Sequence, residues 1–273
     1  MSGGTMKVAA SILAGLGMLA WAAAGAHAAA PAAGDKWVVD AAPDKCTLTR
    51  RFGTDPAAVT LSWWRVPTRR NSTLWVTEQG RPTEEPGSVH VTFGDRTVTV
   101  AARVAKQSAA GQRRWNVVLP DALLADAKGS ESLTLAPARG APIAIALPTF
   151  AGAWRALDAC VAKVAAFWGL DPAEDALIAT PPSLIGSIAD YYNPQDYPRA
   201  ALLAGAGGST GILVAIDAAG VATGCRAILS SGRSDLDTAS CRPARPLRFT
   251  PAVGHDGAPV AGHALLTVMW YTS

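Results

Sequence analysis

Charged side chains are scarce in this chain of 273 residues, where they make up 16% of the total against 49% hydrophobic residues. Disordered chains have the opposite balance, so the sequence predicts a folded protein of one or two domains. The net charge of +3 is too small to indicate a nucleic-acid partner. Cysteine is also rare, with four residues and no Cys-x-x-Cys pair, so we expect no metal site and no cofactor.

Residues 1–28 have the pattern of a secretory signal peptide. The single charge of Lys7 precedes an apolar run over residues 8–24, and the small-residue sequence Ala26-His27-Ala28 follows it. We therefore expect export and cleavage after Ala28. The alternative is an uncleaved inner-membrane anchor, because the apolar run approaches the roughly 20 residues that a span needs. An exported chain with four cysteines is expected to form two disulfides.

Residues 36–168 are predicted to form a β-rich, sandwich-like or barrel-like domain closed by a helix. Segments rich in β-branched and aromatic residues alternate there with turn sequences such as Gly80-Arg81-Pro82 and Gly94-Asp95. The expected strands include residues 60–63, 73–77, 88–93, 97–100, 115–119 and 143–147.

The closing helix is predicted over residues 150–168, where the spacing of apolar residues changes to that of an amphipathic helix. Trp154, Leu157, Val161, Val164 and Trp168 follow one another at steps of three and four residues. Cys160 lies on the same face and points inward. Cys46 is the other cysteine of this half, so we expect a Cys46–Cys160 disulfide.

Residues 169–196 are predicted to form an acidic connector. The stretch from Gly169 to Pro198 holds five acidic residues, no basic residue and five prolines, whereas residues 36–168 have a net charge of +6. A connector of this charge could lie on the basic domain. Asp171-Pro172 has the pattern of an N-cap and a first helical position, which predicts one short helix over residues 173–179.

The last 75 residues show the order strand, strand, helix, strand, so the fold class of the whole chain is predicted to be α+β. Residues 212–216 and 221–229 flank a hairpin turn at Asp217-Ala218-Ala219-Gly220. A helix opens at Ser234-Asp235-Leu236-Asp237, and the terminal strand is expected over residues 260–271.

A series of short motifs in residues 197–273 resembles the C-terminal domain of the TonB family. No single motif is diagnostic, but many occur in order at fitting distances. They are Tyr197-Pro198-Arg199-Ala200-Ala201, the glycines at 208 and 211, Ile216-Asp217-x-x-Gly220-Val221, Cys225-Arg226, Ser230-Ser231-Gly232, Leu236-Asp237-x-x-x-Cys241, Leu247-Arg248-Phe249-x-Pro251-Ala252 and Gly257-x-Pro259-Val260-x-Gly262.

The resemblance implies a periplasmic interaction domain without enzymatic activity. In this family the domain docks an extended segment of an outer-membrane transporter by adding a strand to an exposed edge, in energy-coupled transport. Cys225 and Cys241 would then join the return strand to the helix. The expected partner-binding residues lie on the last strand, where self-association is an alternative because exposed apolar edges invite self-pairing. They are Val260, His263, Leu265, Thr267, Met269 and Tyr271.

The chain also departs from TonB energy transducers. Their inner-membrane helix carries a Ser and a His one turn apart, but here Ser11 is followed by Gly15 four residues later. A Trp-rich β domain stands in place of their long Pro-rich arm. Docking is therefore expected to be retained, while the transmission of force is left open.

Two other functions are considered. Gly207-Gly208-Ser209-Thr210-Gly211 matches the G-x-S-x-G motif of serine hydrolases, with His255 and His263 as candidate bases, but a strand instead of a helix is expected to follow Ser209. Trp63 and Trp64 face opposite sides of a strand, so one could be exposed among Arg65, Arg69 and Arg70 and bind a glycan.

Overall fold

The structure is a computed structural model that describes residues 36–54, 58–79, 87–104, 112–139, 141–243 and 245–272. The predicted signal peptide, residues 1–28, lies outside the described residues. No helix among the described residues has both the length and the apolar character needed to cross a membrane.

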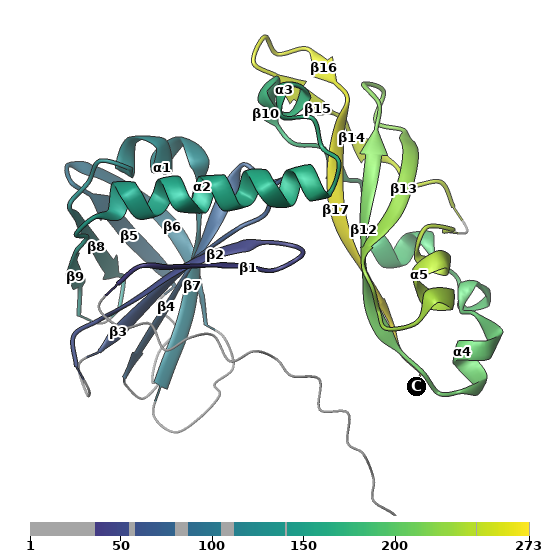
Figure 1. Cartoon of the computed structure of the whole chain (residues 1–273), viewed down its shortest axis with the longest axis horizontal. Helices are drawn as coiled ribbons and strands as arrows, with labels where there is room; N and C mark the ends of the chain where they lie inside the picture. Colours follow the sequence, from purple (N-terminus) through teal and green to yellow (C-terminus); the bar gives the residue numbers. More distant parts are fainter. Residues whose placement is uncertain are drawn as a thin grey trace, which may run out of the picture. The chain divides into compact units, whose positions relative to one another are not determined.

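The fold is α+β, as predicted, and begins with an antiparallel sheet of nine strands that forms a half-barrel. Its strand order is β1-β2-β3-β4-β7-β6-β5-β8-β9. Helix α2 (Phe150–Phe167) packs on one face of this N-terminal sheet, and α1 (Asp121–Ala127) follows β7 (Figure 1). The strands are β1 (Val38–Ala41), β2 (Cys46–Phe52), β3 (Val59–Arg65), β4 (Asn71–Gln79), β5 (Ser88–Phe93), β6 (Arg96–Val104), β7 (Gln112–Pro120), β8 (Ser132–Pro137) and β9 (Ile143–Ala146).

Alternating apolar residues build the core between this sheet and α2. Leu61 and Trp63 of β3 are buried there, while the intervening residues are more exposed, as the two-residue period of a strand requires. Trp154 and Leu157 are buried on the facing side of α2. The predicted helix and the six listed strands are confirmed within a few residues at their ends, whereas β1, β2, β8 and α1 were not predicted.

The C-terminal region contains a three-stranded antiparallel sheet with the order β13-β12-β17. Helix α5 packs on one face of this C-terminal sheet and covers a second hydrophobic cluster that includes Ile212, Val214 and Leu236 (Figure 1). The elements are α4 (Arg199–Leu203), β12 (Gly208–Ile216), β13 (Ala222–Leu229), α5 (Ser234–Ser240), β14 (Phe249–Thr250), β15 (Ala252–Gly254), β16 (Pro259–Val260) and β17 (Gly262–Trp270).

One predicted strand is divided in the structure. The expected strand over residues 260–271 is interrupted at Ala261, so Val260 lies on β16 and pairs with Ala252 of β15 instead of extending β17. Gly262 follows the break. A Cβ added to Gly262 would lie 3.1 Å from both the Ala252 Cβ and the Ile178 Cδ1 atoms, so a side chain at this position would be crowded by β15 and by the connector.

The connector is more structured than predicted. Asp171 caps α3 (Pro172–Ala176) by accepting a hydrogen bond from the Ala173 amide, but the helix ends three residues earlier than expected. Further on, β10 (Ile178–Thr180) pairs with β15, and β11 (Ser183–Leu184) pairs with β14. Two short 3₁₀ helices follow, η1 (Ile188–Tyr191) and η2 (Pro194–Asp196). The sequence predicted one short helix in residues 169–196 but not these short strands and 3₁₀ helices; the division into domains stays a prediction.

Both expected disulfides are present. Cys46 of β2 is bonded to Cys160 of α2, which ties the helix to the sheet. Cys225 of β13 is bonded to Cys241 at the end of α5, which ties this helix to the C-terminal sheet.

Candidate functional site

Strand β17 forms one edge of the C-terminal sheet. All nine of its residues pair with β12, and among the described residues β12 is its only strand neighbour. The other edge of the sheet is β13. An edge strand keeps a row of backbone N–H and C=O groups that another extended chain can pair with.

The two faces of β17 differ in burial. Ala264, Val268 and Trp270 are buried in the second hydrophobic cluster, on the side of α5, as the alternation predicted. On the other face Thr267 is exposed, and Met269 has 69% of its surface exposed. Tyr271 follows the strand and is 78% exposed. The end of the strand therefore presents large apolar side chains to solvent.

The beginning of the same face is covered. The core between the N-terminal sheet and α2 is the first hydrophobic cluster, and Leu213 of β12 belongs to it. Leu265 of β17 and Ile228 of β13 pack against this cluster. Trp168, at the end of α2, is part of that cluster. Contact with the β-rich part of the chain therefore explains the apolar character of Leu265, but it does not explain that of Met269.

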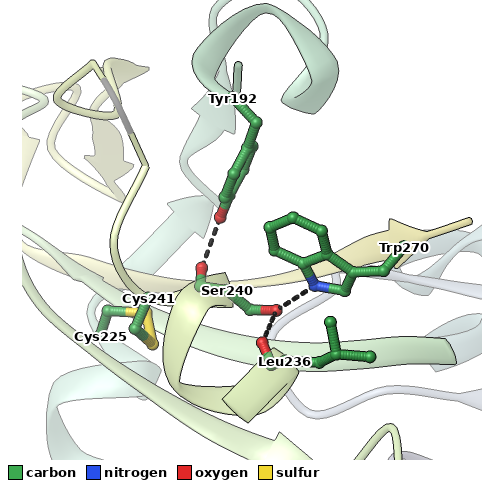
Figure 2. The surroundings of a disulfide bond; sticks show 6 residues. All are labelled: Tyr192, Cys225, Leu236, Ser240, Cys241 and Trp270. Carbon is green, nitrogen blue, oxygen red and sulfur yellow. Dashed lines mark hydrogen bonds between the residues drawn. A yellow bond between two sulfur atoms is a disulfide. The ribbon is translucent and has the colours of Figure 1, made fainter. Parts of the chain in front are cut away.

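Trp270 connects β17 to α5 and to the connector. Its Nε1 donates a 2.8 Å hydrogen bond to the Ser240 hydroxyl, which in turn donates to the Leu236 carbonyl (Figure 2). The rings of Tyr192 and Tyr197 pack edge-on against the indole, at centroid distances of 5.6 and 5.2 Å. Helix α5, Tyr192 and Tyr197 thus hold the end of the edge strand in place.

The hydroxyl of Tyr192 is itself held inside this cluster. It donates a hydrogen bond to the Ser240 carbonyl (Figure 2). Burial, together with the negative charge of Asp196, raises the pKa of Tyr192 to about 12. The phenol therefore stays protonated and remains a donor throughout the physiological pH range.

Asp237 of α5 organises the loop that precedes its helix. Its Oδ1 accepts hydrogen bonds from the Thr210 hydroxyl at 3.0 Å and from the Ser231 amide and hydroxyl, each at 2.8 Å. Its Oδ2 accepts a further hydrogen bond from the Ser230 hydroxyl. Partial desolvation opposes ionisation, but these hydrogen bonds outweigh it and lower the pKa of Asp237.

Replacing Asp237 with Asn is expected to destabilise the protein by about 1–2 kcal/mol at pH 7, because Asn cannot supply the charged acceptor that the four donors share. A lowered pKa in the folded state stabilises the protein above the unfolded-state pKa, and this stabilisation is lost as the pH falls through the folded value. The difference from the parent should therefore shrink below about pH 4. Urea unfolding at several pH values measures it.

The control for this variant is Asp95→Asn in the exposed turn between β5 and β6. It removes the same charge and should leave the stability within about 0.5 kcal/mol of the parent. Equal losses for both variants would mean that net charge, rather than the Asp237 hydrogen bonds, sets the stability.

His263 lies at the covered end of β17. Burial lowers its pKa, and Arg226 lowers it further, while the nearby Glu174 and Asp175 raise it. The net lowering keeps the imidazole neutral at pH 7. His263 is partly buried and lines a pocket together with Glu174 and Asp175 of the connector.

Ser209 and His263, considered from the sequence as a nucleophile and its base, lie too far apart to form a catalytic pair. Ser209 pairs with Met269 and His263 pairs with Ala215, so six residues of β17 separate the two positions. At about 3.3 Å per residue they are roughly 20 Å apart, far beyond hydrogen-bond reach. The carboxylate of Asp237 accepts hydrogen bonds from the hydroxyl groups of Thr210, Ser230 and Ser231. In the described part of the chain, no cluster of His, Cys, Asp and Glu could hold a metal ion.

The tryptophan considered for glycan binding has different neighbours from those expected. Trp64 is half-buried and packs against Trp75, with Lys45 and Arg114 over its ring at 5.0 and 6.0 Å. Arg65 points to the opposite side, where it pairs with the carboxylates of Asp121 and Asp158. Its guanidinium therefore serves the packing of α1 and α2 and is not available to a ligand at Trp64.

Comparison with known families concerns the C-terminal part of the chain. No curated protein and no solved structure gives a significant match. Residues 193–272 match the family model described as the Gram-negative bacterial TonB protein C-terminal. The family is an envelope-associated, non-enzymatic interaction domain. The match begins four residues before the motifs identified in the sequence, and it confirms the resemblance of the C-terminal part of this chain to the TonB C-terminal domain.

Proposed function

We propose that the protein is a periplasmic interaction protein whose C-terminal domain docks an extended segment of an outer-membrane transporter or another envelope protein. The segment would add to the C-terminal sheet as a strand beside β17, with main-chain hydrogen bonds giving affinity and alternate side chains giving specificity. Thr267, Met269 and Tyr271 are the proposed contact residues on or beside this strand. His263 and Leu265, which the sequence also suggested, lie at its covered end. Export by the signal peptide of residues 1–28 is part of the proposal.

The observation that carries the proposal is the position of β17. It is an edge strand inside the segment that matches the TonB family, and Met269 and Tyr271 stand exposed at its end. Trp270 between them is fixed by Ser240, Tyr192 and Tyr197. A held backbone lowers the ordering cost of adding a strand, because less conformational freedom is lost on binding.

The test is hydrogen exchange of the mature chain, with and without synthetic peptides that correspond to the periplasmic segments of outer-membrane transporters. Strand addition is expected to slow exchange of the β17 amides and to leave those of β13, the other edge of the same sheet, unchanged. Binding that protects β13, or neither edge, would contradict the proposal. Concentration-dependent protection of β17 without peptide would indicate pairing between two copies of the chain.

Replacing Met269 with Pro is expected to weaken peptide binding about tenfold or more. Proline removes one backbone donor and its ring obstructs a neighbouring strand, and a tenfold change corresponds to about 1.4 kcal/mol. Titration calorimetry measures the effect, after near-ultraviolet circular dichroism has shown that the variant is folded.

Met269→Ala is the matched control, because it removes the side chain and keeps the backbone donor. It is expected to bind within about threefold of the parent. If the folded proline variant binds as tightly as the parent, the addition of a strand at this part of β17 is wrong.

A further inference from the structure

A groove of about 530 Å³ lies beside β17 and is lined by residues 68–71, 179–184 and 264–266. Successive side chains of a strand point to opposite faces. The groove is lined by three consecutive residues of β17, which point to both faces of the sheet, and by no residue of β12. We therefore infer that it runs along the outer edge of β17, where the peptide proposed above would lie. Its volume falls in the range of roughly 300–1,000 Å³ that is usual for ligand pockets.

The far wall of the groove comes from segments outside the TonB match. The loop between β3 and β4 supplies Thr68, Arg69 and Arg70, and the first residue of β4 supplies Asn71. Arg70 holds this loop against the connector, because its guanidinium pairs with the Asp175 carboxylate at 3.0 Å and its Nε donates to the Ile178 carbonyl at 3.1 Å. The β-rich part of the chain thus contributes directly to the surface beside the docking edge.

Arg69 is the second cation of this wall and differs from Arg70 in its contacts. Its side chain is exposed, and within the described residues no hydrogen bond or ion pair is found for it. The remaining residues that line the groove are uncharged. The charge of Arg70 is balanced by Asp175, so among the described residues that line the groove Arg69 carries the one positive charge without an ion pair.

Resting on the docking role proposed for β17, we infer that the β-rich part of the chain selects the peptide, and that Arg69 favours extended segments that carry an acidic side chain. The backbone of the segment pairs with β17, and a Glu or Asp on its other side reaches the Arg69 guanidinium. Arg presents a planar set of donors that matches a carboxylate in a bidentate arrangement.

The test uses the mature, disulfide-bonded chain and a set of ten-residue synthetic peptides with alternating apolar residues. Each peptide carries one Glu at a different position, and each has a twin with Gln at that position. For at least one position the Glu peptide is expected to bind the parent about three- to tenfold more tightly than its twin, as for a partly exposed ion pair. This preference should vanish in Arg69→Gln.

The matched control is Arg139→Gln, which removes one exposed positive charge from the same part of the chain, outside the groove. It should keep the full preference for the Glu peptide. A preference lost equally in both variants would show that net charge is responsible and would overturn the role of Arg69.

Hydrogen exchange distinguishes a failure of the docking role of β17 from a failure of the peptide selection by Arg69. If peptides protect β17 but Glu and Gln twins bind the parent equally, edge docking stands and the selection by Arg69 is wrong. If no peptide of the set or of the transporter series protects β17, the docking role itself is wrong. Arg69-dependent binding to vesicles of phosphatidylglycerol, without such binding to Glu peptides, would assign the cation to a membrane surface and also overturn the inference.

Discussion

Replacing Trp270 with Ala is expected to lower the free energy of unfolding by about 3–5 kcal/mol, the range for a large aromatic side chain removed from a core. Trp270 is 7% exposed and packs against two tyrosine rings. The variant loses this burial and also the hydrogen bond to Ser240. Urea unfolding followed by far-ultraviolet circular dichroism measures the change.

Trp270→Phe separates packing from hydrogen bonding. Phenylalanine keeps an aromatic ring against Tyr192 and Tyr197 but has no donor for the Ser240 hydroxyl, so we expect a smaller loss, about 1–2 kcal/mol. Trp64→Ala is a second control, at a half-buried tryptophan of the N-terminal sheet, and should also cost less than Trp270→Ala. If the Ala and Phe variants at position 270 are equally unstable, the hydrogen bond rather than the packing holds the strand end.

The same cluster shows what the sequence analysis of the connector did not predict. Its five acidic residues and five prolines predicted a connector with one short helix that could lie on the basic domain. Yet Leu184, Ile188 and Tyr192 pack against the second hydrophobic cluster, and proline is compatible with the short strands and 3₁₀ turns found there. The recurring aromatic and branched apolar residues between positions 184 and 197 were the signal that could have shown it.

Periodicity was most informative where one face of an element is buried along its whole length. Helix α2 was predicted to within one residue of its end, because Trp154, Leu157 and Val164 keep one helical face in the core. Strand β2 was missed because Arg50 and Arg51 interrupt its pattern. In the structure the guanidinium of Arg50 lies over the rings of Trp37 and Phe52, so a charged residue covers part of the aromatic core.

The groove beside β17 could not be predicted from local patterns. It is assembled from three segments that are far apart in the sequence, and the contact that fixes one wall joins Arg70 to Asp175 and Ile178. The sequence predicted the last strand, because strand alternation is a local property, but it predicted neither the separate position of Val260 on β16 nor the burial of Leu265 against the N-terminal core. The residues that would face a bound peptide from across the groove depend on tertiary contacts between those segments.

The second large effect is expected for the disulfide between Cys46 and Cys160. A double replacement with Ala should lower the free energy of unfolding by about 4–5 kcal/mol, because the bond closes a loop with a sequence separation of 114 residues and so restricts the unfolded chain strongly. The bond between Cys225 and Cys241 spans 16 residues, and its removal should cost about 3 kcal/mol.

The comparison of these two variants tests whether restriction of the unfolded chain is the dominant contribution. Loss of the longer loop should also increase the dependence of the unfolding free energy on urea concentration, because a less restricted unfolded chain exposes more surface. Loss of the short loop should change that dependence less. If removing the Cys225–Cys241 bond is the more destabilising change, the attachment of α5 to β13 in the folded state outweighs loop closure, and the C-terminal sheet depends on its disulfide more than the N-terminal sheet does.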